Sequence, residues 1–181
     1  MAKKITDNNA YAIIFLTLVT LASVSLLSAI DSKARPQIIA QQQAKIRQLL
    51  GDIFPEMQEF TQEDGIYTIT GGNDLIGYAF LGKGKGYGGD IKILVGIGNL
   101  FKIKDVVVIS HTETPGLGDK IIKQESFAAQ FVGMNASDVK LKKDGGKVDA
   151  ITGATISSKA VTDGVRAMME DKIAIINGRR G

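Results

Sequence analysis

The stretch Asp149-Ala150-Ile151-Thr152-Gly153-Ala154-Thr155 places two very small side chains directly before a threonine hydroxyl. Gly153 permits a sharp bend, and Gly153 and Ala154 together leave open space around Thr155. The residues that follow carry apolar side chains at the spacing of one helix face, namely Ala160, Val161, Val165 and Met168 or Met169. The pattern predicts that Thr155 stands at or just before a helix N-terminus, where unpaired N–H groups and the helix dipole favour an anion.

A threonine at this position has two interpretations. It can be an ordinary N-cap, because Ser and Thr commonly satisfy the free N–H groups at a helix start. It can also be a covalent attachment point, but a free Thr hydroxyl is a poor nucleophile and needs an outside agent to activate it. These residues alone leave both interpretations open.

The composition limits what chemistry the chain can perform. The 181 residues carry a net charge of only +3, so they do not predict a basic stripe for nucleic acid. A chain of this length with one membrane segment has room for one further domain of about 150 residues. The absence of cysteine excludes Cys-ligated zinc, iron–sulfur clusters, c-type haem and disulfides. Any redox role therefore requires a borrowed cofactor without sulfur ligation.

Residues 11–30 (YAIIFLTLVTLASVSLLSAI) form a run without a charged side chain. At 1.5 Å per residue, a helix of this length covers about 30 Å, the thickness of the hydrocarbon core of a bilayer. A cleaved signal peptide is the alternative, because Lys3 and Lys4 precede the run, but signal peptides have shorter apolar regions of about 7–15 residues. We therefore predict a retained transmembrane helix at 11–30, after a short N-terminal segment at 1–10.

Residues 36–54 predict an amphipathic helix that begins at Pro36, since proline suits a first helical position. We assign residues 31–55 to this linker helix and residues 56–181 to one domain. In that domain, glycines separate strand-like runs at 66–70, 75–81, 91–97 and 104–110, and helical patterns follow at 120–132 and from 157 to about 173. The predicted fold class is α+β, with an antiparallel sheet and packed helices.

Two glycine-rich segments approach known nucleotide motifs and fail their context tests. Residues 84–89 satisfy G-x-G-x-x-G, but a strand rather than a helix is predicted after them. Residues 77–84 resemble a P-loop, but Gly84 stands where Ser or Thr must hold magnesium. We interpret the segment as a flexible hairpin connection.

A second informative stretch is His111-Thr112-Glu113-Thr114-Pro115-Gly116-Leu117-Gly118-Asp119-Lys120. Pro115-Gly116 imposes a turn, and Gly118 permits another close backbone approach. His111 has no second His and no Cys to join it, so the sequence predicts no metal site. Residues 140–146 (KLKKDGG) predict a charged turn that precedes a strand into Asp149; one of its lysines is a candidate for the vicinity of an anionic ligand.

The Asp-x-x-Thr-Gly-Ala-Thr pattern of residues 149–155 resembles the acceptor motif of flavin transferases, which move FMN from FAD onto the last Thr. The run 111–120 and the Gly-Tyr-Gly-Gly segment 86–89 resemble the G subunit of the Rnf complex, a relative of the C subunit of sodium-translocating NADH:quinone reductase. The resemblance implies an FMN-binding domain with covalent FMN in phosphoester linkage to Thr155. It implies a noncovalent flavin site that includes Thr152, Glu113, Thr114 and Gly118.

The resemblance also implies a function. We expect an electron-relay subunit of a complex that couples electron transfer between ferredoxin and NAD to sodium or proton translocation, with no catalytic site complete on this chain. The expected partners are the other subunits, a flavin transferase and the cytoplasmic membrane, with a single pass and most of the chain on the extracytoplasmic side. The alternatives are a C-type quinone-reductase subunit and a non-redox binding domain on a membrane tether.

Overall fold

The computed structural model describes residues 9–180, so most of the predicted segment 1–10, including Lys3 and Lys4, lies outside the described residues. The chain divides into two units, residues 1–47 and residues 48–181.

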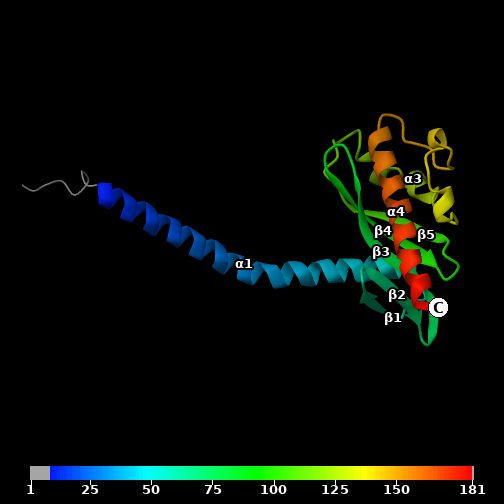
Figure 1. The fold of residues 1–181 in the computed structure, drawn as a ribbon, viewed down its shortest axis with the longest axis horizontal. Coiled ribbons are helices and arrows are strands. Elements are labelled where there is room, and N and C mark those ends of the chain that lie inside the picture. The colour runs from blue at the N-terminus through cyan, green and yellow to red at the C-terminus, as the bar shows by residue number, and fades with distance from the viewer. Residues whose placement is uncertain (1–8, 181) are drawn as a thin grey trace, which may run out of the picture. The chain divides into compact units, whose positions relative to one another are not determined.

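Helix α1 runs without interruption over Asn9–Ile53 (Figure 1). The predicted start of a separate helix at Pro36 is therefore wrong, because Pro36 lies inside α1. Proline has no backbone N–H, so the carbonyl of Ser32 loses its helical partner. Ser32 and Pro36 are both exposed, so water can satisfy this carbonyl and the helix continues.

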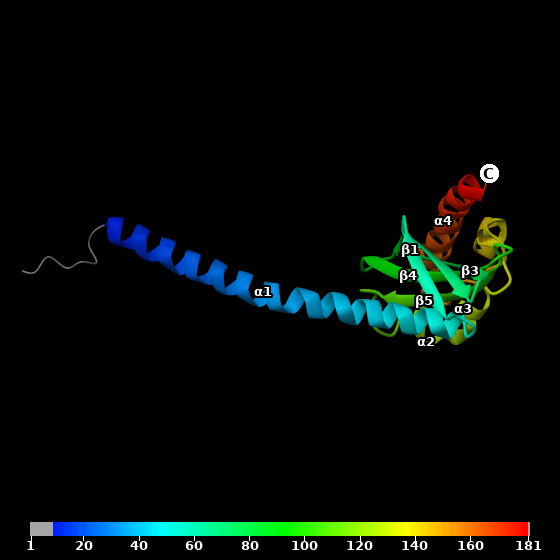
Figure 2. The same ribbon diagram turned by 90° about the horizontal axis from the view of Figure 1, so that it is seen from below.

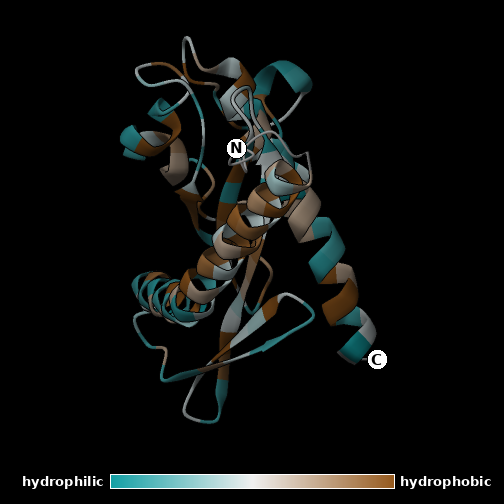
Figure 3. Cartoon of the chain, turned by 90° about the vertical axis from the view of Figure 1, so that its left-hand side faces the viewer, coloured by the Kyte–Doolittle hydropathy of each residue, from teal (hydrophilic) through white to brown (hydrophobic). Residues whose placement is uncertain are grey.

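The predicted apolar span 11–30 falls entirely within α1. Among residues 9–180, α1 is the one helix long and apolar enough to cross a membrane, with a mean hydropathy of 2.4 over its most apolar window. Figure 3 shows apolar residues predominating along the first part of this helix. The hydroxyls of Thr17, Thr20 and Ser23 donate to helix carbonyls three or four residues earlier. These polar groups are thus satisfied inside the helix, as a lipid environment requires.

The second unit is built on an antiparallel sheet in which each strand pairs with the next along the chain (Figures 1 and 2). The strands are β1 (Glu59–Glu63), β2 (Ile66–Gly71), β3 (Asp74–Lys85), β4 (Asp90–Gly98) and β5 (Ile103–Ser110). The four predicted strands are confirmed. Strand β1 was not predicted, because it is an edge strand in which only Phe60 is even half-buried.

The helices cover the sheet unequally. Helix α4 (Thr155–Arg180) packs on β3 and β4, and the main core lies beneath it. On β3, Gly82 and Gly84 face α4: a methyl group at Gly84 would overlap the carbonyl of Ala160. The opposite face receives Ile53 and Phe54 from the end of α1, against Gly96. The glycines thus let α4 on one face, and Ile53 and Phe54 on the other, approach the sheet closely, which fixes α4 and the residues at its start.

The segment between β5 and α4 is less regular than predicted. The helix predicted over 120–132 is divided into α2 (Lys120–Lys123) and α3 (Glu125–Ala129), because Gln124 between them is extended, with φ −98° and ψ 92°. The chain continues through η2 (Ala136–Asp138) and η3 (Lys142–Asp144). The predicted strand into Asp149 is reduced to one parallel bridge between Leu141 and Val148. The predicted α+β class is confirmed, and the final helix extends to Arg180.

Candidate functional site

The 149–155 stretch forms a tight turn that leads directly into α4. The backbone N–H of Ala154 donates to the carbonyl of Ile151 at 2.9 Å, and Gly153 has a φ of +80°. A positive φ at the third residue is what a type II turn requires and what glycine supplies without strain. Thr155 follows as the first residue of α4, and it is exposed. The predicted position of Thr155 at a helix N-terminus is confirmed.

A buried serine holds this turn against the helix. The Ser158 hydroxyl accepts the Ile151 N–H at 3.0 Å and donates to the Ala154 carbonyl at 2.9 Å. Ser158 is fully buried, and its own carbonyl accepts the hydroxyl of Thr162 at 2.8 Å. These bonds restrict the backbone that leads into Thr155. Sequence reasoning assigned no role to Ser158, although the Ser-Ser pair after Thr155 was visible.

The two stretches singled out in the sequence lie side by side. The Lys120 ammonium donates to the carbonyl of Thr152 at 3.3 Å. A methyl group added at Gly153 would lie 3.9 Å from Leu117 Cδ2 and 3.7 Å from Lys120 Nζ. The loop that precedes α2 thus covers one side of the turn that precedes α4, although more than thirty residues separate them.

Glu113 is the link between these segments. Its side chain is only 5% exposed. One carboxylate oxygen accepts the Gly88 N–H at 3.0 Å, and the other accepts the hydroxyl of Ser157. Methyl groups at Gly86 or Gly118 would overlap this carboxylate. The carboxylate therefore joins the glycine hairpin, the 111–120 loop and α4, and both of its oxygens are engaged by the protein.

The other predicted contact residues differ in accessibility. Thr152 and Thr114 are exposed, whereas Gly118 is buried against Glu113 and Ser157. The Thr114 carbonyl accepts the N–H groups of Leu117 and Asp119 at 3.2 and 3.4 Å, which closes the loop into a compact turn. Thr152 and Thr114 can meet a bound ligand, while Glu113 and Gly118 act on the shape of the protein.

The glycine segment 86–89 is a hairpin between β3 and β4, closed by the Gly86 N–H bonding the Gly89 carbonyl at 2.9 Å. The hydroxyl of Thr112 donates to the Gly88 carbonyl at 2.9 Å, which ties the hairpin to the 111–120 loop. A strand on each side excludes the helix that a dinucleotide motif or a P-loop would need. The hairpin interpretation is confirmed.

The side chains of His111 and Asp119 also form bonds within the segment from His111 to Lys123. Nδ1 of His111 accepts the Glu113 N–H at 3.1 Å. The Lys123 ammonium bonds the buried Asp119 carboxylate at 2.6 Å. This bond lowers the pKa of Asp119 from its ordinary value of 3.8, against the opposing effect of burial.

Lys120 bonds the turn before α4, although the predicted candidates were the lysines of residues 140–146. Lys142 pairs with Asp149 at 2.6 Å, at the start of the 149–155 stretch, and Lys147 pairs with Asp138 at 3.1 Å. Lys120 instead lies against the turn itself. In the sequence, Lys120 ends the 111–120 stretch, but nothing local to that stretch shows that it contacts the turn.

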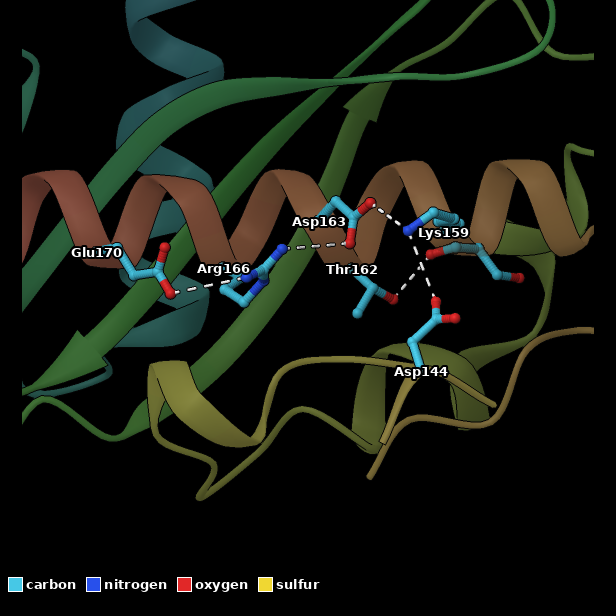
Figure 4. A network of polar contacts seen from close by, with 7 residues as sticks. Asp144, Lys159, Thr162, Asp163, Arg166 and Glu170 are labelled. Atoms are coloured by element: carbon cyan, nitrogen blue, oxygen red, sulfur yellow. Dashed lines mark hydrogen bonds and ion pairs between the residues drawn. The ribbon is translucent and has the colours of Figure 1, made fainter. Parts of the chain in front are cut away.

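A polar network on α4 fixes the η3 segment to the helix (Figure 4). The Lys159 ammonium lies 2.7 Å from Asp163 and 3.6 Å from Asp144 of η3. Arg166 lies 3.8 Å from Asp163 and 3.9 Å from Glu170. The hydrogen bond to Asp163 is the largest cause of the raised pKa of Lys159.

A cavity of about 480 Å³ lies against β5, α2 and α3. Its walls are mainly apolar and include Val106, Val108, Ile121, Phe131 and Val161, with Lys104 and Glu125 as charged members. Neither Thr155 nor Thr152 lines it.

Comparison with known proteins agrees with this arrangement. Residues 86–170, which contain the hairpin, the 111–120 loop and the turn before α4, match the family model of the FMN-binding domain. The G subunit of the proton-translocating ferredoxin:NAD(+) oxidoreductase complex of Clostridium ljungdahlii is 34% identical, over 99% of this chain and 100% of that protein. The G subunit of the ion-translocating oxidoreductase complex of Methanosarcina acetivorans is 31% identical, over 91% of this chain and 96% of that protein.

Among solved structures, NqrC of Shewanella oneidensis is 24% identical, with a TM-score of 0.45 over 64% of this chain and 63% of that one. The identity to the G subunits, extending over nearly the full chain, defines the class: a component of a membrane-bound redox complex. The chain belongs to the G-subunit family of the Rnf-type ion-translocating oxidoreductases. It carries an FMN-binding domain and one N-terminal apolar helix, and it is a membrane-anchored flavin electron relay.

Proposed function

We propose that this chain carries FMN as a phosphoester on Thr155 and relays electrons within an Rnf-type complex. The observation that carries the proposal is that Thr155 is exposed as the first residue of α4, directly after a turn that Gly153 makes possible. Thr152 and Gly153 in the turn are exposed as well, so an enzyme that modifies Thr155 has access to it.

The residues around Thr155 fit a flavin nucleotide. Leu117, beside Gly153 of the turn, and Ile156, directly after Thr155, are 52% and 57% exposed and offer apolar surface that suits a flat ring system. Thr152 and Thr114 supply exposed hydroxyls for a polar ring edge. Glu113 and Gly118 contribute by fixing the loop. The flavin, when bound, supplies redox chemistry in one- or two-electron steps; the protein supplies position and anchorage.

Attachment requires an external flavin transferase with FAD as the co-substrate. The Thr155 oxygen forms a bond to the phosphorus of the FMN half, and the bond from that phosphorus to the oxygen of the AMP half breaks. AMP leaves, and a base takes the proton of the hydroxyl. No redox change accompanies this transfer. Because the linkage is covalent, the cofactor cannot dissociate from a domain exposed outside the cytoplasm.

The partners follow from the relatives. The Clostridium ljungdahlii protein is named as a component of a proton-translocating ferredoxin:NAD(+) oxidoreductase complex. We infer that this chain passes electrons between ferredoxin and NAD together with other subunits, and that those subunits move protons or sodium ions. The relay role suits a chain whose described residues include a single candidate membrane span.

Identity over nearly the full chain favours the G subunit over the C subunit of the quinone reductase. A tethered domain without a redox cofactor is the remaining alternative, and a labelling experiment separates it. The full chain is co-expressed with a flavin transferase, denatured, and examined for flavin fluorescence in a gel and by intact mass. We expect one FMN-phosphoryl group on the wild type and none on Thr155→Val. A wild-type chain without flavin would disprove the proposal.

We also propose that the domain lies on the extracytoplasmic side of the membrane, and this orientation has a separate test. Because the natural sequence has no cysteine, one cysteine introduced at Leu100, which is 77% exposed, is the only thiol in the chain. We expect a membrane-impermeant maleimide to label it from the extracytoplasmic side of intact cells. Labelling only after cell lysis would place the domain in the cytoplasm.

A further inference from the structure

We infer that Lys120 is the positioning residue for the phosphoryl group at Thr155, and that its charge is required for efficient flavin attachment. This inference rests on the proposed function, since it concerns the same hydroxyl. Lys120 ends the 111–120 stretch, but it is not among the residues that the sequence predicted to contact the flavin. It comes from α2, across the turn from α4.

The position of the ammonium is the first argument. Lys120 Nζ donates to the Thr152 carbonyl at 3.3 Å and would lie 3.7 Å from a methyl group at Gly153. It therefore lies over the turn that leads into Thr155. The side chain is half-buried, so part of its conformational freedom is already lost before any ligand arrives.

The distribution of charge is the second argument. The neighbouring carboxylate of Asp119 is bonded to Lys123 at 2.6 Å, and Glu113 is bonded to Gly88 and Ser157. Among the ion pairs of residues 9–180, none includes Lys120, and its hydrogen bond goes to a neutral carbonyl. The Lys120 ammonium can therefore pair with an added anion without first breaking an ion pair.

A phosphoryl group on Thr155 supplies that anion. Cationic side chains next to a transferring phosphoryl group stabilise the negative charge on its oxygens. After attachment, the same charge holds the phosphodiester near the turn and restricts the linked nucleotide. Lys142 is less suited to this role because Asp149 already neutralises it.

A purely structural role for Lys120, as a donor that holds the Thr152 carbonyl, makes different predictions. Lys120→Gln keeps an N–H donor and removes the charge, whereas Lys120→Arg keeps both. Lys102→Met is the matched control, because Lys102 is exposed in the β4–β5 hairpin, at the opposite end of β4 from the glycine hairpin.

The test uses the full chain in detergent, purified flavin transferase and FAD, with the rate of labelling followed by intact mass. We expect Lys120→Gln to be labelled more slowly by up to about fivefold, the upper limit for an exposed ion pair. Lys120→Arg and Lys102→Met should remain close to the wild-type rate. Equal rates for Lys120→Gln and the wild type would overturn the inference.

A second readout needs no attachment. In the Thr155→Val background, FMN and riboflavin are titrated separately, since they differ by the phosphate alone. We expect a preference for FMN that disappears with Lys120→Gln and persists with Lys120→Arg. A preference unchanged by Lys120→Gln would contradict the inference, while an unlabelled wild type with FAD and transferase present would instead contradict the proposed function.

Discussion

Ser157 lies two residues beyond Thr155 on α4, and its hydroxyl donates a hydrogen bond to the buried carboxylate of Glu113. The second oxygen of the same carboxylate accepts the Gly88 N–H from the hairpin between β3 and β4. One side chain thus sets the position of the proposed attachment helix relative to the sheet. Disturbing Glu113 should affect both stability and attachment.

Glu113→Ala leaves the Gly88 N–H and the Ser157 hydroxyl without their partner inside the protein. We expect a loss of about 1–3 kcal/mol in the free energy of unfolding, because the buried hydroxyl of Ser157 loses its partner, whereas Gly88 is exposed and its N–H can bond water. Glu113→Gln keeps an oxygen for Gly88 and places an amide beside Ser157, so its loss should be smaller. Denaturant titration of the full chain in detergent measures both.

Thr112→Val is the control for this pair of variants. It removes the exposed hydrogen bond from the Thr112 hydroxyl to the Gly88 carbonyl, worth about 0.5–1.5 kcal/mol. If Thr112→Val costs as much as Glu113→Ala, the buried carboxylate is not the principal link between the hairpin and α4.

Substitutions at Gly153 and Thr152 test separately whether flavin attachment depends on the backbone conformation of the turn or on its side chains. Gly153 has a φ of +80°, where a β-branched residue is strained, so Gly153→Val should distort the turn and sharply reduce flavin labelling by the transferase. Thr152 contributes its carbonyl to Lys120, which Thr152→Ala retains, so that variant should keep most of its flavin. Intact mass distinguishes them, and equal labelling would show that the turn geometry is irrelevant.

The sequence predicted the site better than the elements that support it. Thr155 at the head of a helix followed from small residues before an apolar-periodic run, because both signals are local. Lys120 could not be assigned, since its contact with Thr152 depends on how α2 folds back beside the turn. The helix predicted over 120–132 was also wrong, because the break at Gln124 has no proline or glycine to announce it.

Local sequence signals also failed to predict strand β1 and the continuity of helix α1. The β1 sequence EFTQE lacks buried alternation because an edge strand is held mainly by its backbone pairing with β2. Pro36 predicts a helix start because prolines commonly occupy that position. In an exposed helix, the carbonyl that loses its partner can be hydrated, so nothing local forces α1 to end.

The pH dependence of stability should report the pair formed by Asp119 and Lys123. Lys123 lowers the pKa of Asp119 from 3.8, so the ionised carboxylate stabilises the fold above that value. This contribution is lost as pH falls from the ordinary pKa through the lowered one. Lys123→Met removes the largest lowering cause and leaves the effect of burial, so the pKa of Asp119 should rise.

In Lys123→Met, the free energy of unfolding should therefore fall less than in the wild type as pH decreases through the ordinary pKa of Asp119. Denaturant titrations between about pH 3 and pH 6 measure the difference, over the range in which carboxylates titrate. Lys102→Met removes an equal charge from an exposed position and serves as the control. Coincident curves for Lys123→Met and Lys102→Met would show that the pair does not contribute.

The close approach of α4 to β3 gives a final matched pair of substitutions, because two glycines of one strand face the same helix and meet different atoms. A methyl group at Gly84 would overlap the backbone carbonyl of Ala160, which can yield only if the helix moves. A methyl group at Gly82 would meet the side chain of Met168, which can change rotamer. Overpacking costs about 1–3 kcal/mol, and we expect Gly84→Ala at the upper end and Gly82→Ala at the lower. Because Ala160 lies close after Thr155 on α4, Gly84→Ala should also slow flavin attachment, while Gly82→Ala should not; equal labelling rates would mean that the start of α4 is positioned independently of the sheet.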